Sequence, residues 1–237
     1  MKSYRLTFSE DSLAKKVLYK VLFIDSLLVT FAISSAIALG DSPDLHFREE
    51  GFLTYVSCLQ LLIAAIISFK IFGIIKNSQN PKLSSNKIVW LVITLGLLFL
   101  ALDDAFEIHE EIDALLHYVL NITQTSITDL ADDLIVGSYV LFFLIYVASQ
   151  WKIIQPFKPS FIFFQAGFVL TVIMIILDLA SHNSYVASLM TDDAERVQAL
   201  KEWFGAWEDA AKIYAEGMFI VGVYRCRQIA KSMNSKQ

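Results

Sequence analysis

Acidic and imidazole side chains are concentrated in one stretch of the chain that directly follows a long apolar run. The stretch begins at Asp103 and Asp104, continues through Glu107 and His109, and ends at His117. Carboxylate and imidazole groups bind zinc and other transition metals, and they also act as general acids and bases. Because ionisable groups at membrane depth are costly, we treat these residues as candidates for function.

Two other segments carry polar residues at helical spacing. Asp178 and His182 are four residues apart at the end of an apolar run, so one face of a helix would hold both. Asp209, Lys212 and Glu216 are three and four residues apart and also share a face. We therefore predict a site for a divalent metal, zinc or another transition metal, between three helices. The predicted metal ligands are Asp104, His109, Asp178, His182 and Asp209.

The simplest chemistry for such a site is attack of a metal-activated water on a lipid or another membrane substrate. Glu107 or Glu216 would then act as the general base that takes the proton of that water. The chain contains no HExxH, GxSxG, phosphate-binding or dinucleotide-binding signature. The first hypothesis, a metal-dependent membrane hydrolase, therefore rests on the ligand cluster alone.

Two further hypotheses use the same charges differently. In a proton- or cation-coupled transporter, Glu216 and Asp25 would titrate within the membrane. In a non-catalytic accessory subunit, the intramembrane charges would pair with a partner membrane protein. A purely structural interpretation is also open, in which Lys212 pairs with Asp103 or Asp104 and the outer charges are solvated.

The elements that must position these residues are membrane-spanning helices. Hydrophobic residues make up 56% of the chain and the mean hydropathy is +0.55, against about 45–50% apolar residues in soluble proteins. Several runs reach the roughly 20 residues that a helix needs to cross a bilayer. We predict an all-α, polytopic membrane protein, a single domain over residues 1–237 that forms a bundle of six transmembrane helices. The predicted spans are 19–39, 52–75, 88–110, 134–150, 159–180 and 204–224.

The third predicted span should continue without a break into the acidic stretch, because neither Pro nor Gly lies at the transition. Six spans also place both termini on one side, together with 15 of the 19 Lys and Arg residues. The positive-inside rule then assigns both termini to the cytoplasm, in a bacterial inner membrane. The expected partners are the lipid bilayer, a lipid or ion substrate and other membrane proteins, and no nucleic acid.

Overall fold

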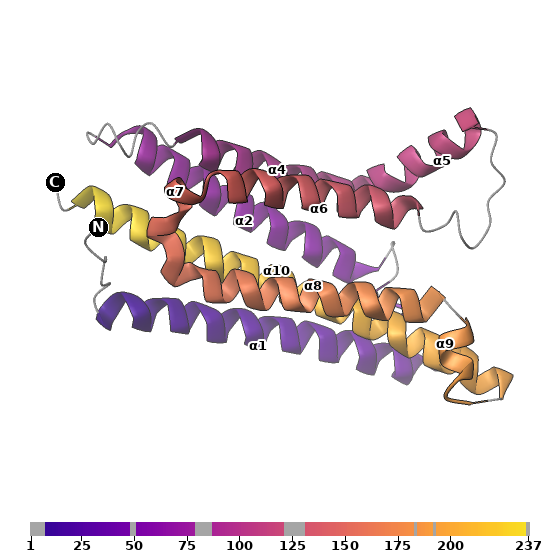
Figure 1. The fold of residues 1–237 in the computed structure, drawn as a ribbon. Helices are drawn as coiled ribbons and strands as arrows, with labels where there is room; N and C mark the ends of the chain where they lie inside the picture. The colour runs from indigo at the N-terminus through magenta and orange to yellow at the C-terminus, as the bar shows by residue number, and fades with distance from the viewer. Residues whose placement is uncertain are drawn as a thin grey trace.

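The computed structural model describes residues 8–47, 51–78, 87–120, 131–182, 184–191 and 193–235. These residues form helices and no strand (Figure 1). The prediction of an all-α chain is therefore confirmed for the described residues. The long helices are α1 (Phe8–Leu39), α2 (Phe52–Lys76), α4 (Lys87–Phe106), α6 (Ala131–Ser149), α8 (Phe161–His182) and α10 (Ala194–Ser235). The shorter ones are α5 (Ile108–Leu120), α7 (Trp151–Ile154), the 3₁₀ helix η2 (Gln155–Ser160) and α9 (Ser184–Ser188).

Four helical segments are long and apolar enough to cross a membrane. They are Ser12–Leu39, Phe52–Lys76, Lys87–Phe106 and Trp151–Ser181, and they correspond to the predicted spans 19–39, 52–75, 88–110 and 159–180. The predicted span 134–150 contains only a shorter apolar helix, Gly137–Ser149. The predicted span 204–224 lies inside α10 but carries four charged residues, Glu208, Asp209, Lys212 and Glu216. Four apolar helices are typical of a multi-pass membrane protein, and the count of six stays a prediction.

The most polar of the long helices, α10, lies inside the bundle. It packs against α1, α2 and α8, and Figure 1 shows these helices running alongside it. Small residues such as Ala206, Ala210, Ala211 and Gly217 are buried on α10, which allows its neighbours to approach closely. The other helices therefore cover the charged face of α10, and this explains how a helix of low hydropathy occupies the centre of an apolar bundle.

The helix that enters the acidic stretch is broken, so the prediction of one continuous helix over 88–110 is wrong. α4 ends at Phe106 and α5 begins at Ile108, with Glu107 between them at φ 51°. The Asp103 carboxylate accepts a hydrogen bond from the backbone N–H of His109 at 3.0 Å. A helix start needs such acceptors for its free N–H groups. Asp103 thus caps α5 from the preceding helix, and a break forms without Pro or Gly.

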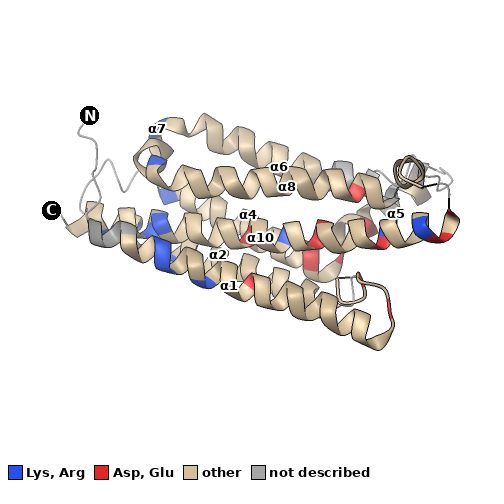
Figure 2. Cartoon of the chain, turned by 90° about the horizontal axis from the view of Figure 1, so that it is seen from below, with Lys and Arg blue, Asp and Glu red and all other residues tan. Residues whose placement is uncertain are grey.

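The charged side chains are divided between the two ends of the bundle. Figure 2 shows Lys and Arg gathered at the end where α1 begins and α10 finishes, whereas most Asp and Glu lie toward the opposite end. Arg196, Lys201 and Lys212 are exceptions, because they lie in the first half of α10. This asymmetry agrees with the sequence pattern on which the predicted orientation rests.

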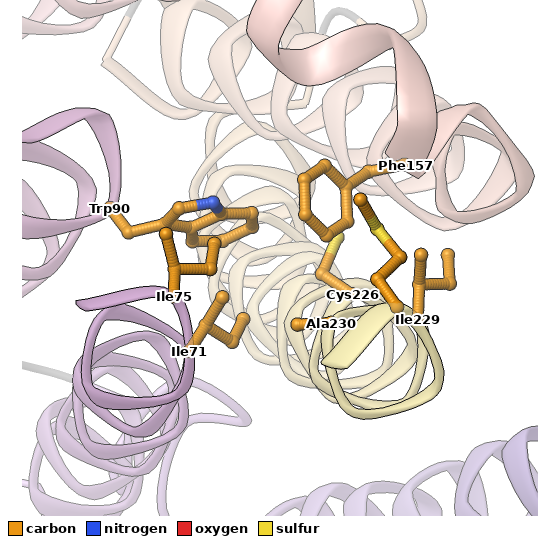
Figure 3. Close-up of a cluster of buried hydrophobic side chains, with 8 residues drawn as sticks. Ile71, Ile75, Trp90, Phe157, Cys226, Ile229 and Ala230 are labelled. Carbon is orange, nitrogen blue, oxygen red and sulfur yellow. The ribbon is translucent and has the colours of Figure 1, made fainter. Parts of the chain in front are cut away.

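Apolar side chains fill the bundle at three levels. At the basic end, Trp90 packs edge-on against Phe157 with ring centroids 4.9 Å apart, and Ile71, Ile75 and Cys226 complete the contact (Figure 3). A second cluster, which includes Val29, Leu53, Ala206 and Ile213, fills the opposite half of the bundle. The third is smaller and lies between them at Ala64, Ile220 and Val223.

Two glycines bring α8 and α10 into close contact. A Cβ added at Gly167 would lie 2.5 Å from the ring of Phe219, and one added at Gly222 would lie 2.9 Å from the ring of Phe164. Each helix therefore places a phenylalanine over a glycine of the other. The two rings also stack, with centroids 6.4 Å apart.

We expect Gly167→Ala to destabilise the protein, because the added methyl group would overlap the ring of Phe219. Overpacking of this kind costs about 1–3 kcal/mol. The matched control is Gly137→Ala on α6, where a Cβ would meet no atom within 4 Å. Thermal unfolding of the purified protein, followed by tryptophan fluorescence, should show a lower Tm for Gly167→Ala only. Equal Tm values for the two variants would contradict the packing described for α8 and α10.

Candidate functional site

A layer of buried polar side chains crosses the bundle between the apolar clusters. Asp25 on α1 is 1% exposed and Glu216 on α10 is 6% exposed, and Ser57 and Gln60 of α2 are buried beside them. Along α10 this layer lies between Ile213 on one side and the cluster that contains Ile220 on the other. We call Asp25, Ser57, Gln60 and Glu216 the central polar layer.

Each acid of the central polar layer receives one hydrogen bond from α2. The Ser57 hydroxyl donates to Glu216 Oε1 at 2.7 Å. The Gln60 amide donates from Nε2 to Asp25 Oδ1 at 2.8 Å. Ser57 and Gln60 are three residues apart, so one face of α2 supplies both donors. α2 therefore links α1 and α10 through their carboxyl groups.

The other oxygen of each acid is buried without a partner. Asp25 Oδ2, Glu216 Oε2 and Gln60 Oε1 make no hydrogen bond within the described residues. The two carboxyl groups lie within electrostatic range of each other. A Cβ on Gly217 would lie 2.4 Å from Asp25 Oδ2, so a glycine is what allows the Asp25 carboxyl to lie against α10. A buried oxygen without a partner is costly, and such a group is a candidate for proton or cation binding.

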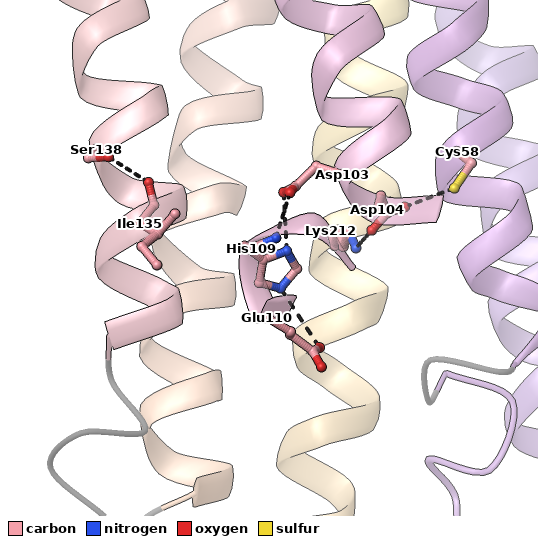
Figure 4. A network of polar contacts seen from close by, with 8 residues as sticks. All are labelled: Cys58, Asp103, Asp104, His109, Glu110, Ile135, Ser138 and Lys212. Atoms are coloured by element: carbon pink, nitrogen blue, oxygen red, sulfur yellow. Dashed lines mark hydrogen bonds and ion pairs between the residues drawn. The ribbon is translucent and has the colours of Figure 1, made fainter. Parts of the chain in front are cut away.

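An ion pair lies one turn from this layer, toward the acidic end of α10. The Lys212 ammonium group contacts the Asp104 carboxylate across α10 and α4 (Figure 4). The Cys58 thiol of α2 also donates to Asp104, with its sulfur 3.4 Å from Oδ2. Lys212 is within electrostatic range of Glu216 and Asp209 as well. The contact with Asp104 confirms the hypothesis that Lys212 pairs with Asp103 or Asp104. The same lysine also offsets part of the negative charge of Glu216 and Asp209.

Asp209 extends the polar residues of α10 toward the acidic end of the bundle. It is within electrostatic range of Lys212, Asp104 and Asp178. A small cavity of about 10 Å³ lies beside it and is lined by Ser57, Lys212 and four other residues. A cavity of roughly that size holds at most one water molecule. Asp209 and Ser57 of the central polar layer therefore line the same small cavity.

His109 and Glu107 lie at the break between α4 and α5. His109 Nδ1 is 3.2 Å from Asp103 Oδ2, and its Nε2 is 3.9 Å from Glu110 Oε1 (Figure 4). Glu107 is half-buried, and its backbone carbonyl accepts hydrogen bonds from the N–H groups of Glu110 and Glu111. Both residues therefore stabilise the start of α5, away from the buried Glu216.

The predicted metal ligands do not form a metal site in the part of the chain that is described. No group of three His, Cys, Asp or Glu side chains there is arranged to hold a metal ion. Asp104 and Asp209 lie near each other, but the ammonium group of Lys212 occupies the position expected for a metal cation. His109 pairs instead with Asp103. Asp178 is close enough to interact electrostatically with Asp209, and the side chain of His182 lies outside the described residues.

The spacing of charged residues in the sequence does not identify three residues of the site. Ser57 and Cys58 contact Glu216 and Asp104, and Gly217 makes room for Asp25. A usable signal was present on α2, where Ser57, Gln60 and Ser68 occur on the face that is buried. Polar residues repeated along one face of an apolar helix indicate a neighbour that needs hydrogen bonds.

We expect Lys212→Met to destabilise the bundle because it leaves the Asp104 carboxylate, which is 12% exposed, without its cation. Breaking a fully buried pair from one side costs about 3–5 kcal/mol, and the loss should be smaller here because the Lys212 side chain is 31% exposed. The double variant Asp104→Asn/Lys212→Met removes both charges and should recover most of the lost Tm. Lys152→Met, which removes an exposed lysine from α7, is the control. A double variant no more stable than Lys212→Met would show that the loss of stability does not come from the uncompensated charge of Asp104.

Comparison with known proteins places this site within one family. No curated protein and no solved structure matches the chain. The model of a family described as a domain of unknown function, DUF8692, matches residues 22–226. The matched range contains Asp25, Asp104, Lys212 and Glu216, and thus the central polar layer and the ion pair beside it. The chain therefore belongs to the DUF8692 family, and the buried polar residues lie within the region that defines the match.

Proposed function

We propose that this protein is a proton-coupled membrane carrier in which Glu216 and Asp25 take up and release protons inside the helix bundle. One observation supports the proposal above the others. Two buried carboxyl groups from different helices lie near each other, and each has one oxygen with a hydrogen-bond donor and one oxygen without. Intramembrane acids of this kind form proton relays in pumps and transporters.

The unpartnered oxygens are suited to carrying a proton. A protonated carboxyl group has an O–H to donate, whereas an ionised one only accepts. Glu216 Oε2 and Asp25 Oδ2 face no donor in the described residues, so a proton on either oxygen costs no existing hydrogen bond. The Gln60 carbonyl oxygen is a buried acceptor without a partner. A proton on either acid would therefore supply a hydrogen-bond donor where these buried acceptors lack one within the described residues.

The acids are spaced so that a proton could move stepwise through the bundle. Asp209 and Glu216 are seven residues apart on α10, which is about 10 Å at 1.5 Å per residue. Asp25 lies beside Gly217 and five residues from Lys20, or roughly 8 Å along α1 at 1.5 Å per residue. Lys212 lies between Asp209 and Glu216 and balances their charge. This series supports a path from the acidic end of the bundle to its centre and onward toward the basic end.

The charge distribution supports an orientation for this path. Lys and Arg gather at the end of the bundle where α1 begins and α10 finishes, and basic residues favour the cytoplasmic side of a membrane. We therefore propose that both termini are cytoplasmic and that Asp209 is nearer the opposite side. Protons would enter at the acidic end and pass through the central polar layer.

A metal-dependent hydrolase receives no specific support from the geometry, because the candidate ligands that are described pair with other groups. The accessory-subunit hypothesis differs from the proposal in a measurable way. A carrier moves protons when it is reconstituted alone, whereas an accessory subunit does so only with its partner. Reconstitution of the purified chain into liposomes therefore separates the two.

We expect Glu216→Gln to abolish proton uptake by liposomes that contain the purified protein and an internal pH-sensitive dye. The amide has nearly the same shape as the carboxyl group, can still accept the hydrogen bond of Ser57, and cannot exchange a proton. Glu195→Gln is the control, because it makes the same change at an exposed position of the same helix. Asp25→Asn should resemble Glu216→Gln. Uptake that persists at the wild-type rate in Glu216→Gln would refute the proposal.

A second variant tests whether the position of Asp25 matters as well as its charge. Gly217→Ala adds a Cβ that would lie 2.4 Å from Asp25 Oδ2, so it should push the carboxyl group away from Glu216. We expect slower proton uptake although both acids are retained. Gly73→Ala, which adds a methyl group where no atom lies within 4 Å, should leave uptake unchanged. Wild-type uptake in a folded Gly217→Ala variant would argue against transfer between the two acids.

A further inference from the structure

A groove at the basic end of the bundle is lined by cationic and amide side chains. It lies between α2 and α10 and has a volume of about 510 Å³. Lys70, Gly73 and Asn77 line it on one side, and Arg227, Lys231 and Asn234 line it on the other. The groove is open to the surroundings and is remote from the central polar layer in sequence and in level along both helices. We call it the basic groove.

The charge of the basic groove is opposite to that of the whole chain. The chain has a net charge of −5, yet the described residues that line the groove include three cations and no acidic residue. Within the described residues, none of Lys70, Arg227 and Lys231 forms an ion pair with a carboxylate. The Nε atom of Arg227 is buried and makes no hydrogen bond there. A guanidinium group presents N–H donors in a planar fork that matches a phosphate, so the lining of the groove suits a phosphate-like anion.

The level of the groove along the helices identifies where that anion comes from. Lys70 to Asn77 spans seven residues, or about 10 Å along α2, and α2 is apolar enough to cross a membrane up to Lys76. The headgroup layer begins where such a helix leaves the hydrocarbon core. Ile66, four residues before Lys70 on the same face of α2, is 54% exposed. Cations at headgroup depth above an exposed apolar side chain match a phospholipid, which has a phosphate and acyl chains at these two levels.

We propose that the basic groove binds the phosphate headgroup of an anionic phospholipid from the leaflet that faces the chain termini. Lys70, Arg227 and Lys231 contact the phosphate, and Asn77 and Asn234 donate to the remaining headgroup oxygens. Basic pockets between helices on the cytoplasmic side of membrane proteins bind anionic headgroups in this way. The proposal requires the helices to be embedded in a membrane, and it is independent of proton transfer through Glu216.

The groove offers a way to block the ligand without changing any charge. Gly73 lines it, and a Cβ at this position would meet no atom within 4 Å. A leucine side chain at position 73 would therefore extend into open space inside the groove. Gly73→Leu tests occupancy of the groove, whereas Arg227→Gln and Lys231→Gln test its charge. Lys152→Gln is the matched control, because Lys152 is an exposed lysine of α7 that does not line the groove.

The test is native mass spectrometry of the purified protein with phosphatidylglycerol and phosphatidylcholine in equal amounts. We expect the wild-type protein to retain phosphatidylglycerol preferentially. Each lost cation should weaken that binding about fivefold, as expected for a basic residue near an anionic membrane surface. Arg227→Gln/Lys231→Gln and Gly73→Leu should both lose the preference, and Lys152→Gln should keep it. Tryptophan fluorescence confirms that each variant is folded, and Gly73→Leu carries the test if the double variant is not.

Several results would overturn the proposal. Equal retention of the two lipids by the wild-type protein would show that the groove does not select anionic headgroups. An unchanged preference in a folded Gly73→Leu variant would place the lipid elsewhere. If inorganic phosphate displaced phosphatidylglycerol at equal concentration, the ligand would be a soluble anion and not a lipid. If the cations only balance the C-terminal ends of α2 and α10, the variants would lower the Tm equally in both lipids and leave the preference unchanged.

Discussion

The burial of a charged helix constrains the whole bundle. α10 carries Asp209, Lys212 and Glu216 into an apolar environment, where an uncompensated charge is far more costly than in water. Each of these charges therefore needs a neighbour that the surrounding helices must supply. α4 supplies Asp104 to Lys212, and α2 supplies Ser57 to Glu216. The bundle closes around α10 because the helices that pair its charges also exclude water from them.

The same constraint explains why helix packing and site geometry are inseparable in this protein. Gly217 lets α1 approach α10 closely enough for the Asp25 carboxyl group to lie beside Glu216. Gly167 and Gly222 likewise let α8 and α10 approach each other, because each glycine leaves room for a phenylalanine ring of the other helix. Apolar clusters on both sides of the central polar layer keep it enclosed. Polar contacts fix how the helices face each other, and apolar packing stabilises the arrangement.

The two ends of the bundle have different chemistry and, in our proposals, different roles. The acidic end contains Asp209, Asp104 and the Asp103–His109 pair that starts α5, and it provides an entry for protons. The basic end contains the groove between α2 and α10, and it provides a contact for anionic lipid. An even number of antiparallel crossings would keep both chain termini at the basic end.

Composition and residue spacing establish a helical chain that is apolar enough for a membrane and polar at a few defined positions. The rise per residue was enough to put Lys212 at about the level of Asp103 and Asp104, and to put Glu216 and Asp25 within apolar segments, because these inferences depend only on position along each helix. Sequence spacing could not show that Asp103 would cap α5 and break the helix at Glu107, since the competing acceptor is a side chain from the preceding turn. Nor could it identify Ser57 and Cys58 as partners of residues more than 40 positions away.

Which side chains meet depends on the packing of the helices and not on residue spacing. The predicted metal ligands have a spacing that would allow them to meet at one metal ion. In the structure, Asp104 instead pairs with Lys212, and His109 pairs with Asp103, which caps α5. The outcome depends on the rotation of each helix about its own axis. That rotation is set by the sum of many packing contacts between helices distant in sequence, so no single stretch of sequence specifies it.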